Sequence, residues 1–131
     1  MKDKLIYPTV ESVKFVNRLV NLMSNMKADQ HKLLMSDSFI ATIIEKARED
    51  TGDVYTKGAI LLRDLIIAHG FESGNKRTAF VVTVHFINSN GGSMRAKNFN
   101  KAEKILRNIR RYDLEDLSHW LRTGDINESK T

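Results

Sequence analysis

The stretch His69-Gly-Phe-Glu-Ser-Gly-Asn-Lys-Arg-Thr-Ala-Phe80 decides how this chain folds. It separates two strongly apolar segments, residues 59–68 and 79–87, and each is hydrophobic on nearly all sides. Such segments predict buried helices rather than surface helices. A polar, glycine-containing loop between two buried helices is costly, because its amides and charged side chains must find partners near the core. This pattern is typical of a functional site.

The loop combines a basic side chain with a predicted anion-binding position. His69 ends the first apolar segment and is a candidate general base, because histidine changes protonation state near neutral pH. Phe71 is expected to anchor the loop in the core. The second helix then begins, and its unpaired amides and positive dipole end favour an anion. The candidate phosphate-binding and nucleotide-binding residues there are Gly74, Asn75, Lys76 and Arg77.

The same residues resemble the signature of the Fic/Doc (Fido) family, roughly His-x-Phe-x-acid-Gly/Ala-Asn-x-Arg. The resemblance is closest to the Doc (death-on-curing) toxins, because Lys76 follows the asparagine and Thr78-Ala79 follow the arginine. It implies an all-α fold, a compact Fido-fold helical bundle. In that fold the histidine deprotonates a target hydroxyl, while the loop holds the phosphates of a nucleotide and a divalent cation.

The resemblance implies a toxin-like transferase that moves a phosphoryl group from ATP to a hydroxyl of a target protein, such as a translation elongation factor. His69 would be the base, and Mg²⁺ or Mn²⁺ would accompany ATP. The alternatives are AMP transfer to a protein, as in most Fic enzymes, and a Fido-fold protein that binds a nucleotide or a partner and transfers nothing. The inhibitory Ser/Thr-x-x-x-Glu-Gly/Asn motif of self-restrained Fic proteins does not occur in the sequence. We therefore expect an antitoxin in trans.

Two positions depart from the signature. Ser73 stands where the family has an acidic residue, and Glu72 precedes it by one position. A serine hydroxyl is a poor substitute for a carboxylate around Mg²⁺, so the metal-side residue is either Ser73 or Glu72. AMP-transferring members have a second arginine at the position that Phe80 occupies here. Doc-type members also lack this arginine.

A connector before the first apolar segment contains the β-forming residues Val54, Tyr55 and Thr56. They predict a short extended flap. In the Fic family a flap before the motif helix aligns the target by strand pairing, so these residues are candidates for target docking. The alternative is a loop in which Tyr55 packs as a lid.

The remaining pattern predicts further helices. Thr9 caps a first amphipathic helix from Val10, whose inward positions are expected to be Val13, Val16, Leu19, Val20 and Met23. Residues 31–35 are expected to form a short helical piece, and Ser36 or Asp37 to cap a second helix ending near Asp50. A basic helix is predicted over residues 98–111. Asp113 then caps a last helix that Gly124 ends. His85 is expected to be a hydrogen-bonded core or boundary residue.

The chain has 131 residues, which predicts a single domain over residues 1–124 and a disordered tail over residues 125–131. It contains no cysteine, which excludes disulfides and thiol chemistry and suits the cytoplasm. No signal peptide is visible, and no apolar run approaches the roughly 18 residues of a membrane span. No membrane role is therefore expected.

The net charge of +5 is concentrated in residues 95–111. This basic stripe has Glu103 as its one acidic residue and seven basic residues: Arg95, Lys97, Lys101, Lys104, Arg107, Arg110 and Arg111. The favoured interpretation is a solvated helix face. The stripe could also contact nucleic acid or an acidic partner. A third hypothesis, after the transferase and the Fido-fold protein that transfers nothing, is therefore a helix–turn–helix DNA-binding protein.

Overall fold

The computed structural model describes residues 4–23, 33–96 and 98–127, and this part of the chain is helical, as the sequence predicted. The elements in chain order are α1 (Val10–Met23), α2 (Asp37–Glu49), α3 (Val54–Ala68), α4 (Asn75–Ser89), α5 (Phe99–Arg107), the short 3₁₀ helix η2 (Ile109–Arg111) and α6 (Leu114–Thr123). Among the described residues, none of the helices is both long and apolar enough to cross a membrane.

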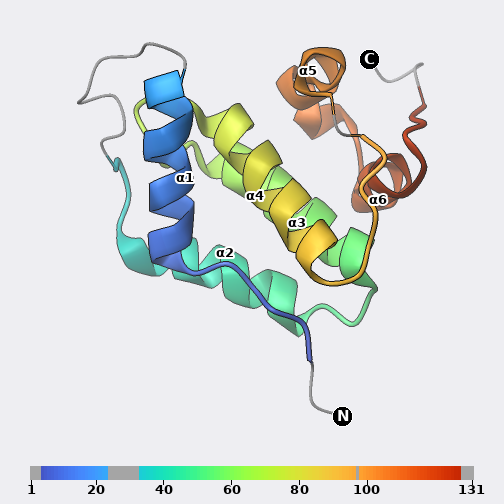
Figure 1. Ribbon diagram of the computed structural model, residues 1–131, viewed down its shortest axis with the longest axis horizontal. Coiled ribbons are helices and arrows are strands. Elements are labelled where there is room, and N and C mark those ends of the chain that lie inside the picture. The colour runs from blue at the N-terminus through green and yellow to red at the C-terminus, as the bar shows by residue number, and fades with distance from the viewer. Residues whose placement is uncertain (1–3, 24–32, 97, 128–131) are drawn as a thin grey trace.

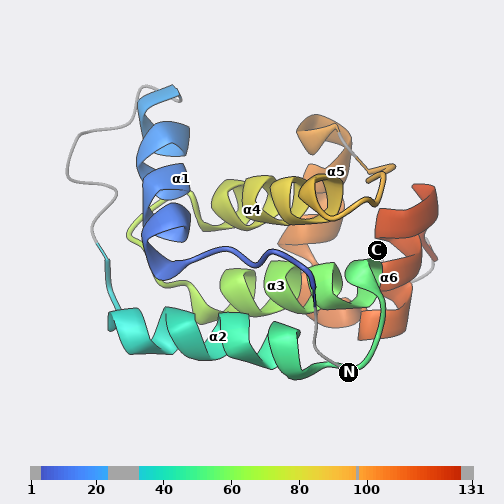
Figure 2. The same cartoon turned by 60° about the horizontal axis from the view of Figure 1, so that its bottom comes forward.

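Helix α3 lies at the centre of the fold and packs against α2, α4, α6 and η2. Figure 2 shows α2, α3 and α4 as three stacked rods, with α1 across one end of the stack and α5 and α6 at the other. The loop that joins α3 to α4 lies at the α1 end (Figure 1). The predicted site loop is therefore held between the two central helices and α1.

The burial predicted for the first apolar segment is confirmed for its first half, whereas residues 66–68 are half-buried. Four consecutive residues of α3, from Ala59 to Leu62, are at most 2% exposed. In α4, Phe86 and Ile87 are likewise buried. Burying a large aliphatic or aromatic side chain stabilises a fold by about 1.5–3 kcal/mol, so the α3–α4 pair forms a rigid frame for the loop between its ends.

The extended flap predicted at residues 54–56 is wrong, because these residues form the first turn of α3. Asp53 caps the helix: its Oδ1 accepts hydrogen bonds from the amides of Tyr55 (3.1 Å) and Thr56 (3.0 Å). Aspartate is among the strongest N-caps, and the cap overrides the β-preference of the residues that follow. The Tyr55 hydroxyl accepts a hydrogen bond from the amide of Ser93 at 2.9 Å.

A buried lysine of α3 caps the C-terminal end of α2. Lys57 is 5% exposed, and its Nζ donates to the carbonyl oxygens of Ala47 (3.2 Å), Arg48 (3.0 Å) and Asp50. The last carbonyls of a helix have no partner within it and carry the negative end of the dipole. The ammonium group therefore satisfies these carbonyls and fixes α2 to α3.

Helix α1 begins after Thr9 as predicted, but its inward face differs from the prediction. Leu19 and Met23 are 41% and 84% exposed, whereas Asn17 and Asn21 are 0% and 3% exposed. The apolar periodicity therefore misassigned part of the buried face. The two asparagines point toward the site loop, as described below.

The basic helix predicted over residues 98–111 is broken at Asn108, which is also a correction. Helix α5 ends at Arg107, and the Asn108 side chain donates to the carbonyl of Lys104 at 2.8 Å. Asparagine competes in this way with the backbone bonds that would continue a helix. The chain then turns into η2. On the inward side, Ala102, Ile105, Leu106 and Ile109 are buried.

Residues 33–35 are not helical, so that part of the short helical piece predicted over residues 31–35 is wrong; residues 31 and 32 lie outside the described part of the chain. Leu33 forms an isolated antiparallel bridge with Phe71. His85 is exposed rather than buried, and its ring nitrogen lies 3.4 Å from the Ser89 hydroxyl.

The boundaries of α2 and α6 agree with the prediction. Asp113 and Asp116 form a capping box at the start of α6, and Gly124 ends the helix in a left-handed conformation. Most of the predicted tail, residues 128–131, lies outside the described residues.

Candidate active site

His69 ends α3 in an unusual backbone conformation. Its φ and ψ are 50° and 49°, and it is the non-glycine residue with positive φ in the described part of the chain. A left-handed conformation costs a residue with a side chain about 1–2 kcal/mol, and such residues gather at functional sites. The turn leaves the imidazole exposed at the end of a buried helix.

The segment after His69 is pinned from two sides. The carbonyl of Gly70 accepts a hydrogen bond from the amide of Leu34 at 2.7 Å, and Phe71 is 4% exposed in the core. A Cβ at Gly70 would lie 2.9 Å from the sulfur of Met35. A side chain at position 70 would therefore require the Met35 side chain to shift.

Asn75 closes the loop on itself. Its Oδ1 accepts from the amide of Phe71 at 3.0 Å, and its Nδ2 donates to the carbonyl of Phe71 at 2.8 Å. The side chain is 8% exposed. It thus acts as a clamp across the turn, and the group that Asn75 offers to an anion is its backbone amide.

The loop leads into the open N-terminus of α4. Gly74 is the N-cap, with φ of 78°, and its lack of a side chain leaves the first turn without a side-chain cap. The first amides of a helix have no internal partner and carry the positive end of the dipole. The carbonyl of Gly74 already accepts from Thr78 at 2.8 Å, so the turn is formed while its leading amides face outward.

Two buried asparagines of α1 hold the loop from behind. Asn17 Nδ2 donates to the carbonyl of Ser73 (2.8 Å) and to the hydroxyl of Thr78 (3.0 Å), and Asn21 Nδ2 donates to Asn17 Oδ1 (3.2 Å). A Cβ at Gly74 would lie 2.7 Å from Asn21 Oδ1. The glycine therefore makes room for α1, as well as supplying the left-handed turn.

A cleft of about 660 Å³ opens beside the loop. This volume is in the range of small-molecule sites. The structure brings six of the predicted site residues to this cleft: His69, Glu72, Ser73, Gly74, Asn75 and Lys76. The cleft therefore presents an imidazole, the uncapped end of α4 and an ammonium group to the same space.

The comparison with protein families agrees with this geometry. A sequence model described as the Fic/DOC family matches residues 9–87, which run from the start of α1 almost to the end of α4. The chain belongs to the Fic/DOC family. No curated protein and no solved structure matches the chain.

Arg77 departs from what the sequence predicted for this Fic/DOC protein, because it does not line the cleft. Its guanidinium lies 4.0 Å from the centre of the Phe99 ring, in a neighbouring apolar groove. Stacking on an aromatic face holds an arginine by a cation–π interaction. The predicted docking residues Val54, Tyr55 and Thr56 also lie away from the cleft, at the other end of α3.

The second wall of the cleft in this Fic/DOC protein was not predicted. It consists of Leu106, Arg107, Asn108, Ile109, Arg110 and Arg111, from the end of α5 and from η2. The charge of these arginines is visible in the sequence, and their i, i+3, i+4 spacing would place them on one face even of an unbroken helix. The sequence gives no sign that this face lies beside the motif loop.

The donors in the cleft fit a cation that is held mainly by phosphate and water. Glu72 is the carboxylate that lines it, and Ser73 adds a hydroxyl. In the described residues, no group of three or more His, Cys, Asp or Glu is arranged to hold a metal. Mg²⁺ is commonly bound through one or two carboxylates together with the phosphates of a nucleotide.

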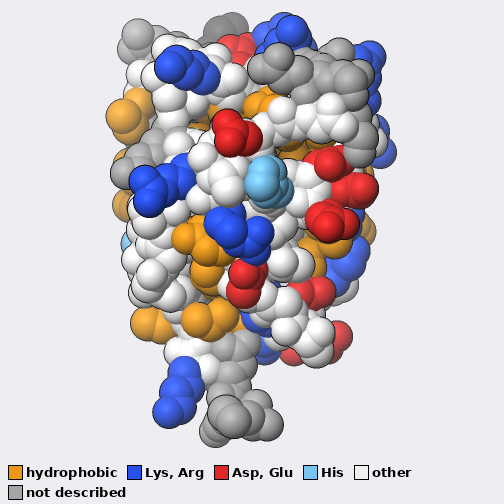
Figure 3. Space-filling model, turned by 90° about the vertical axis from the view of Figure 1, so that its right-hand side faces the viewer, with side chains coloured by type: hydrophobic (Ala, Val, Ile, Leu, Met, Phe, Trp, Pro, Cys, Tyr) orange, Lys and Arg blue, Asp and Glu red, His pale blue; other side chains and the backbone are white. Residues whose placement is uncertain are grey.

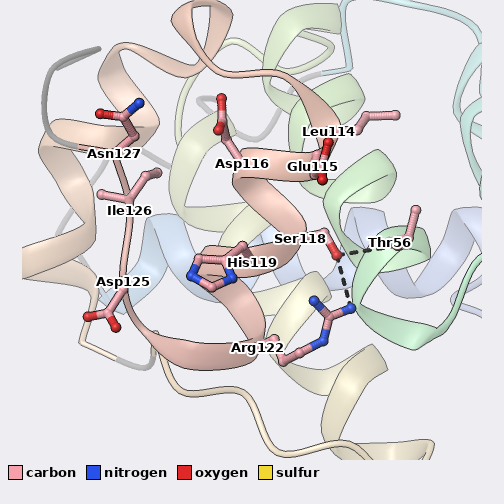
Figure 4. Close-up of a pocket in the computed structure, with 10 residues that line it drawn as sticks. All are labelled: Thr56, Leu114, Glu115, Asp116, Ser118, His119, Arg122, Asp125, Ile126 and Asn127. Carbon is pink, nitrogen blue, oxygen red and sulfur yellow. Dashed lines mark hydrogen bonds between the residues drawn. The ribbon is translucent and has the colours of Figure 1, made fainter.

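A second hollow, of about 690 Å³, lies on α6 and the segment that follows it. Figure 4 shows His119 there among Asp116, Asp125 and Arg122. Figure 3 shows this side of the molecule, where acidic and basic side chains alternate around a histidine.

Several polar groups in this hollow are used by the fold. Arg122 donates to the carboxylate of Asp53 at 2.8 Å, and Asp116 belongs to the capping box of α6. The motif cleft, with its open helix end, is the better candidate for the active site of this Fic/DOC protein.

Proposed function

We propose that this Fic/DOC protein transfers a phosphoryl group from ATP to a hydroxyl group of a target protein. One observation carries the proposal: an exposed imidazole and an uncapped helix N-terminus open into the same cleft. The imidazole suits a proton acceptor, and the helix end suits a phosphate. The resemblance to Doc toxins supports phosphoryl transfer over other chemistry, and a translation elongation factor is the proposed target.

In this reaction the target hydroxyl attacks the γ-phosphorus of ATP as His69 accepts the hydroxyl proton. The bond from the γ-phosphorus to the bridging oxygen breaks, and ADP leaves. The amides at the start of α4 and the ammonium group of Lys76 stabilise charge on the phosphate oxygens. When bound, Mg²⁺ or Mn²⁺ would neutralise phosphate charge, with Glu72 as its protein carboxylate and Ser73 as a further oxygen donor.

The network behind the loop supports the proposal, because catalysis of this kind depends on position. The Asn75 clamp and the Asn17 hydrogen bonds fix the loop relative to α3 and α4. The segment at residues 33–35, where Leu33 bridges to Phe71, lies beside the loop and replaces residues 54–56 as our proposed docking edge for a target strand.

The test is paired labelling with ATP that carries label in the γ-phosphate or in the α-phosphate. Wild type, His69→Ala and the matched control His119→Ala are each incubated with purified elongation factor and with cell lysate, in Mg²⁺ or Mn²⁺. We expect γ-label on protein from wild type and from His119→Ala, and a rate lower by roughly 10²–10⁴-fold in His69→Ala. Label from the α-phosphate instead would mean AMP transfer.

A second candidate function is binding without transfer. Ser73 at the family's acidic position and the position of Arg77 outside the cleft favour it. If wild type transfers neither label, this candidate replaces the enzyme. A Ser73→Asp variant that then gained γ-label transfer would identify the missing carboxylate as the cause. Whether the protein transfers a group or only binds, an antitoxin in trans is the proposed partner that restrains it.

A further inference from the structure

The wall of the motif cleft opposite the loop carries unpaired positive charge. Arg110 and Arg111 line the cleft from η2, both are exposed, and within the described residues neither forms an ion pair. By contrast, Arg107 on the same wall is paired with Glu103. Three further arginines, Arg48, Arg63 and Arg122, each pair with a carboxylate.

The two walls together give the cleft a strong excess of positive charge. Lys76 faces it from α4, and Arg110 and Arg111 from η2, while Glu72 is the acidic residue among those that line it. The apolar residues Ile66, Ile67, Leu106 and Ile109 also line the cleft. Apolar surroundings lower the local dielectric and strengthen the attraction between these cations and an anion.

We propose that Arg110 and Arg111 form a second anion-binding position, so that the cleft takes a ligand with a chain of two or more phosphates. One phosphate would lie at the start of α4, and another would contact the guanidinium groups of η2. The inference rests on the proposed function in that ATP is such a ligand. It adds residues from a part of the chain, beyond residue 87, that the family match does not include.

The chain leaves the α5 axis at Asn108. Arg110 and Arg111, after this break, line the cleft, while Lys101 and Lys104 of the same basic stripe do not. Arginine suits the role, since its planar group holds phosphate oxygens through paired hydrogen bonds. The stripe thus divides into a cleft-facing part and a solvent-facing part.

The test is binding of inorganic tripolyphosphate and of single inorganic phosphate, measured by isothermal titration calorimetry. The variants are Arg110→Ala/Arg111→Ala and the matched control Lys101→Ala/Lys104→Ala, which removes the same charge from the solvent-facing part. We expect the Kd for tripolyphosphate to rise about tenfold or more in the arginine variant, and by much less in the lysine variant. Arg110→Lys/Arg111→Lys should recover part of the affinity. Thermal unfolding checks that each variant is folded.

Equal losses in the two alanine variants would overturn the proposal, because they would show a general effect of charge. It would also be overturned if wild type bound tripolyphosphate no better than phosphate, or if the loss in the arginine variant appeared only with duplex DNA. The label-transfer experiment tests the proposed function separately, because His69→Ala should lose transfer but keep its affinity for tripolyphosphate. If binding depended on the arginines but wild type transferred no label, this inference would hold and the proposed transferase function would be wrong.

Discussion

At the scale of single residues, the loop is held by hydrogen bonds from buried asparagine side chains. Asn17 is fully buried, and its amide joins the carbonyl of Ser73 to the hydroxyl of Thr78. Asn75 ties the two ends of the turn together. Because the backbone groups of Phe71 and the carbonyl of Ser73 have fixed partners, the loop can offer its remaining amides to an anion in a fixed direction, which is the condition for electrostatic stabilisation.

Asn17→Ala is expected to loosen this loop. The substitution leaves the part-buried carbonyl of Ser73 and the buried hydroxyl of Thr78 without this partner, which costs about 1–3 kcal/mol of unfolding free energy. Amide hydrogen exchange at residues 73–76 should become faster, and transfer activity should fall by more than the fraction of unfolded protein explains. Denaturant titration and exchange measurements on the same samples test both effects.

Thr83→Val is the matched control for a buried polar substitution. The Thr83 hydroxyl is buried without a hydrogen-bond partner among the described residues. Replacing it with a methyl group should raise the unfolding free energy by about 1 kcal/mol and leave the loop unchanged. A loss of stability in Thr83→Val equal to that in Asn17→Ala would contradict the assignment of a specific role to Asn17.

At the scale of helices, the capping residues at the helix ends set where each helix begins and stops. Asp53 starts α3 where β-forming residues suggested a strand, and Asn108 ends α5 before the basic stripe is complete. Lys57 closes α2 from a neighbouring helix. Each of these residues satisfies backbone groups that a helix leaves unpaired.

The cap at Asp53 predicts a contribution to stability that depends on pH. Burial alone would raise the pKa of Asp53, but the Thr56 amide and the Arg122 guanidinium, with a further amide, hold the pKa below its ordinary value of 3.8. The unfolded chain therefore binds the proton more readily than the folded chain. The contribution is fully present above pH 3.8 and is lost as the pH falls through the lowered pKa.

Asp53→Asn removes this titration while keeping a capping side chain. Urea unfolding at a series of pH values should show a smaller decrease of the unfolding free energy in acid for the variant than for wild type. An identical acid dependence in the two proteins would mean that Asp53 has the same pKa in the folded and unfolded states.

Lys57→Met tests the cap on α2. The methionine fills similar space but leaves buried carbonyls unpaired, so we expect the unfolding free energy to fall by about 2–3 kcal/mol. The control is Lys46→Met, since Lys46 lies on α2 and forms an ion pair with Asp64 at 3.0 Å. A pair at the surface contributes about 0–1 kcal/mol. Equal effects of the two variants would contradict the capping role of Lys57.

At the scale of the whole molecule, the cleft joins segments that are distant in the sequence. The motif loop between α3 and α4 supplies one wall, and the end of α5 with η2 supplies the other. The α3–α4 pair, and the position of the site loop between these helices, could be predicted because hydrophobic periodicity and a loop of unusual composition are local signals.

Other features could not be predicted, because they depend on contacts across the fold. The direction of Arg77 is set by the Phe99 ring, which belongs to another helix. The inward face of α1 carries asparagines because the loop offers them a carbonyl and a hydroxyl. The approach of η2 to the loop follows from the packing of η2 on α3. None of these pairings leaves a periodic pattern in the sequence.

The central claim is that both walls of the motif cleft bind one phosphate chain beside His69. Chemical-shift mapping by NMR during titration with a nonhydrolysable ATP analogue tests it most directly, because it reads the whole chain in one experiment. We predict the largest shifts at the amides of Lys76 and Arg77, at the His69 ring and at the side chains of Arg110 and Arg111. Shifts that gather instead around His119 and Arg122, or that leave η2 unchanged, would contradict this account.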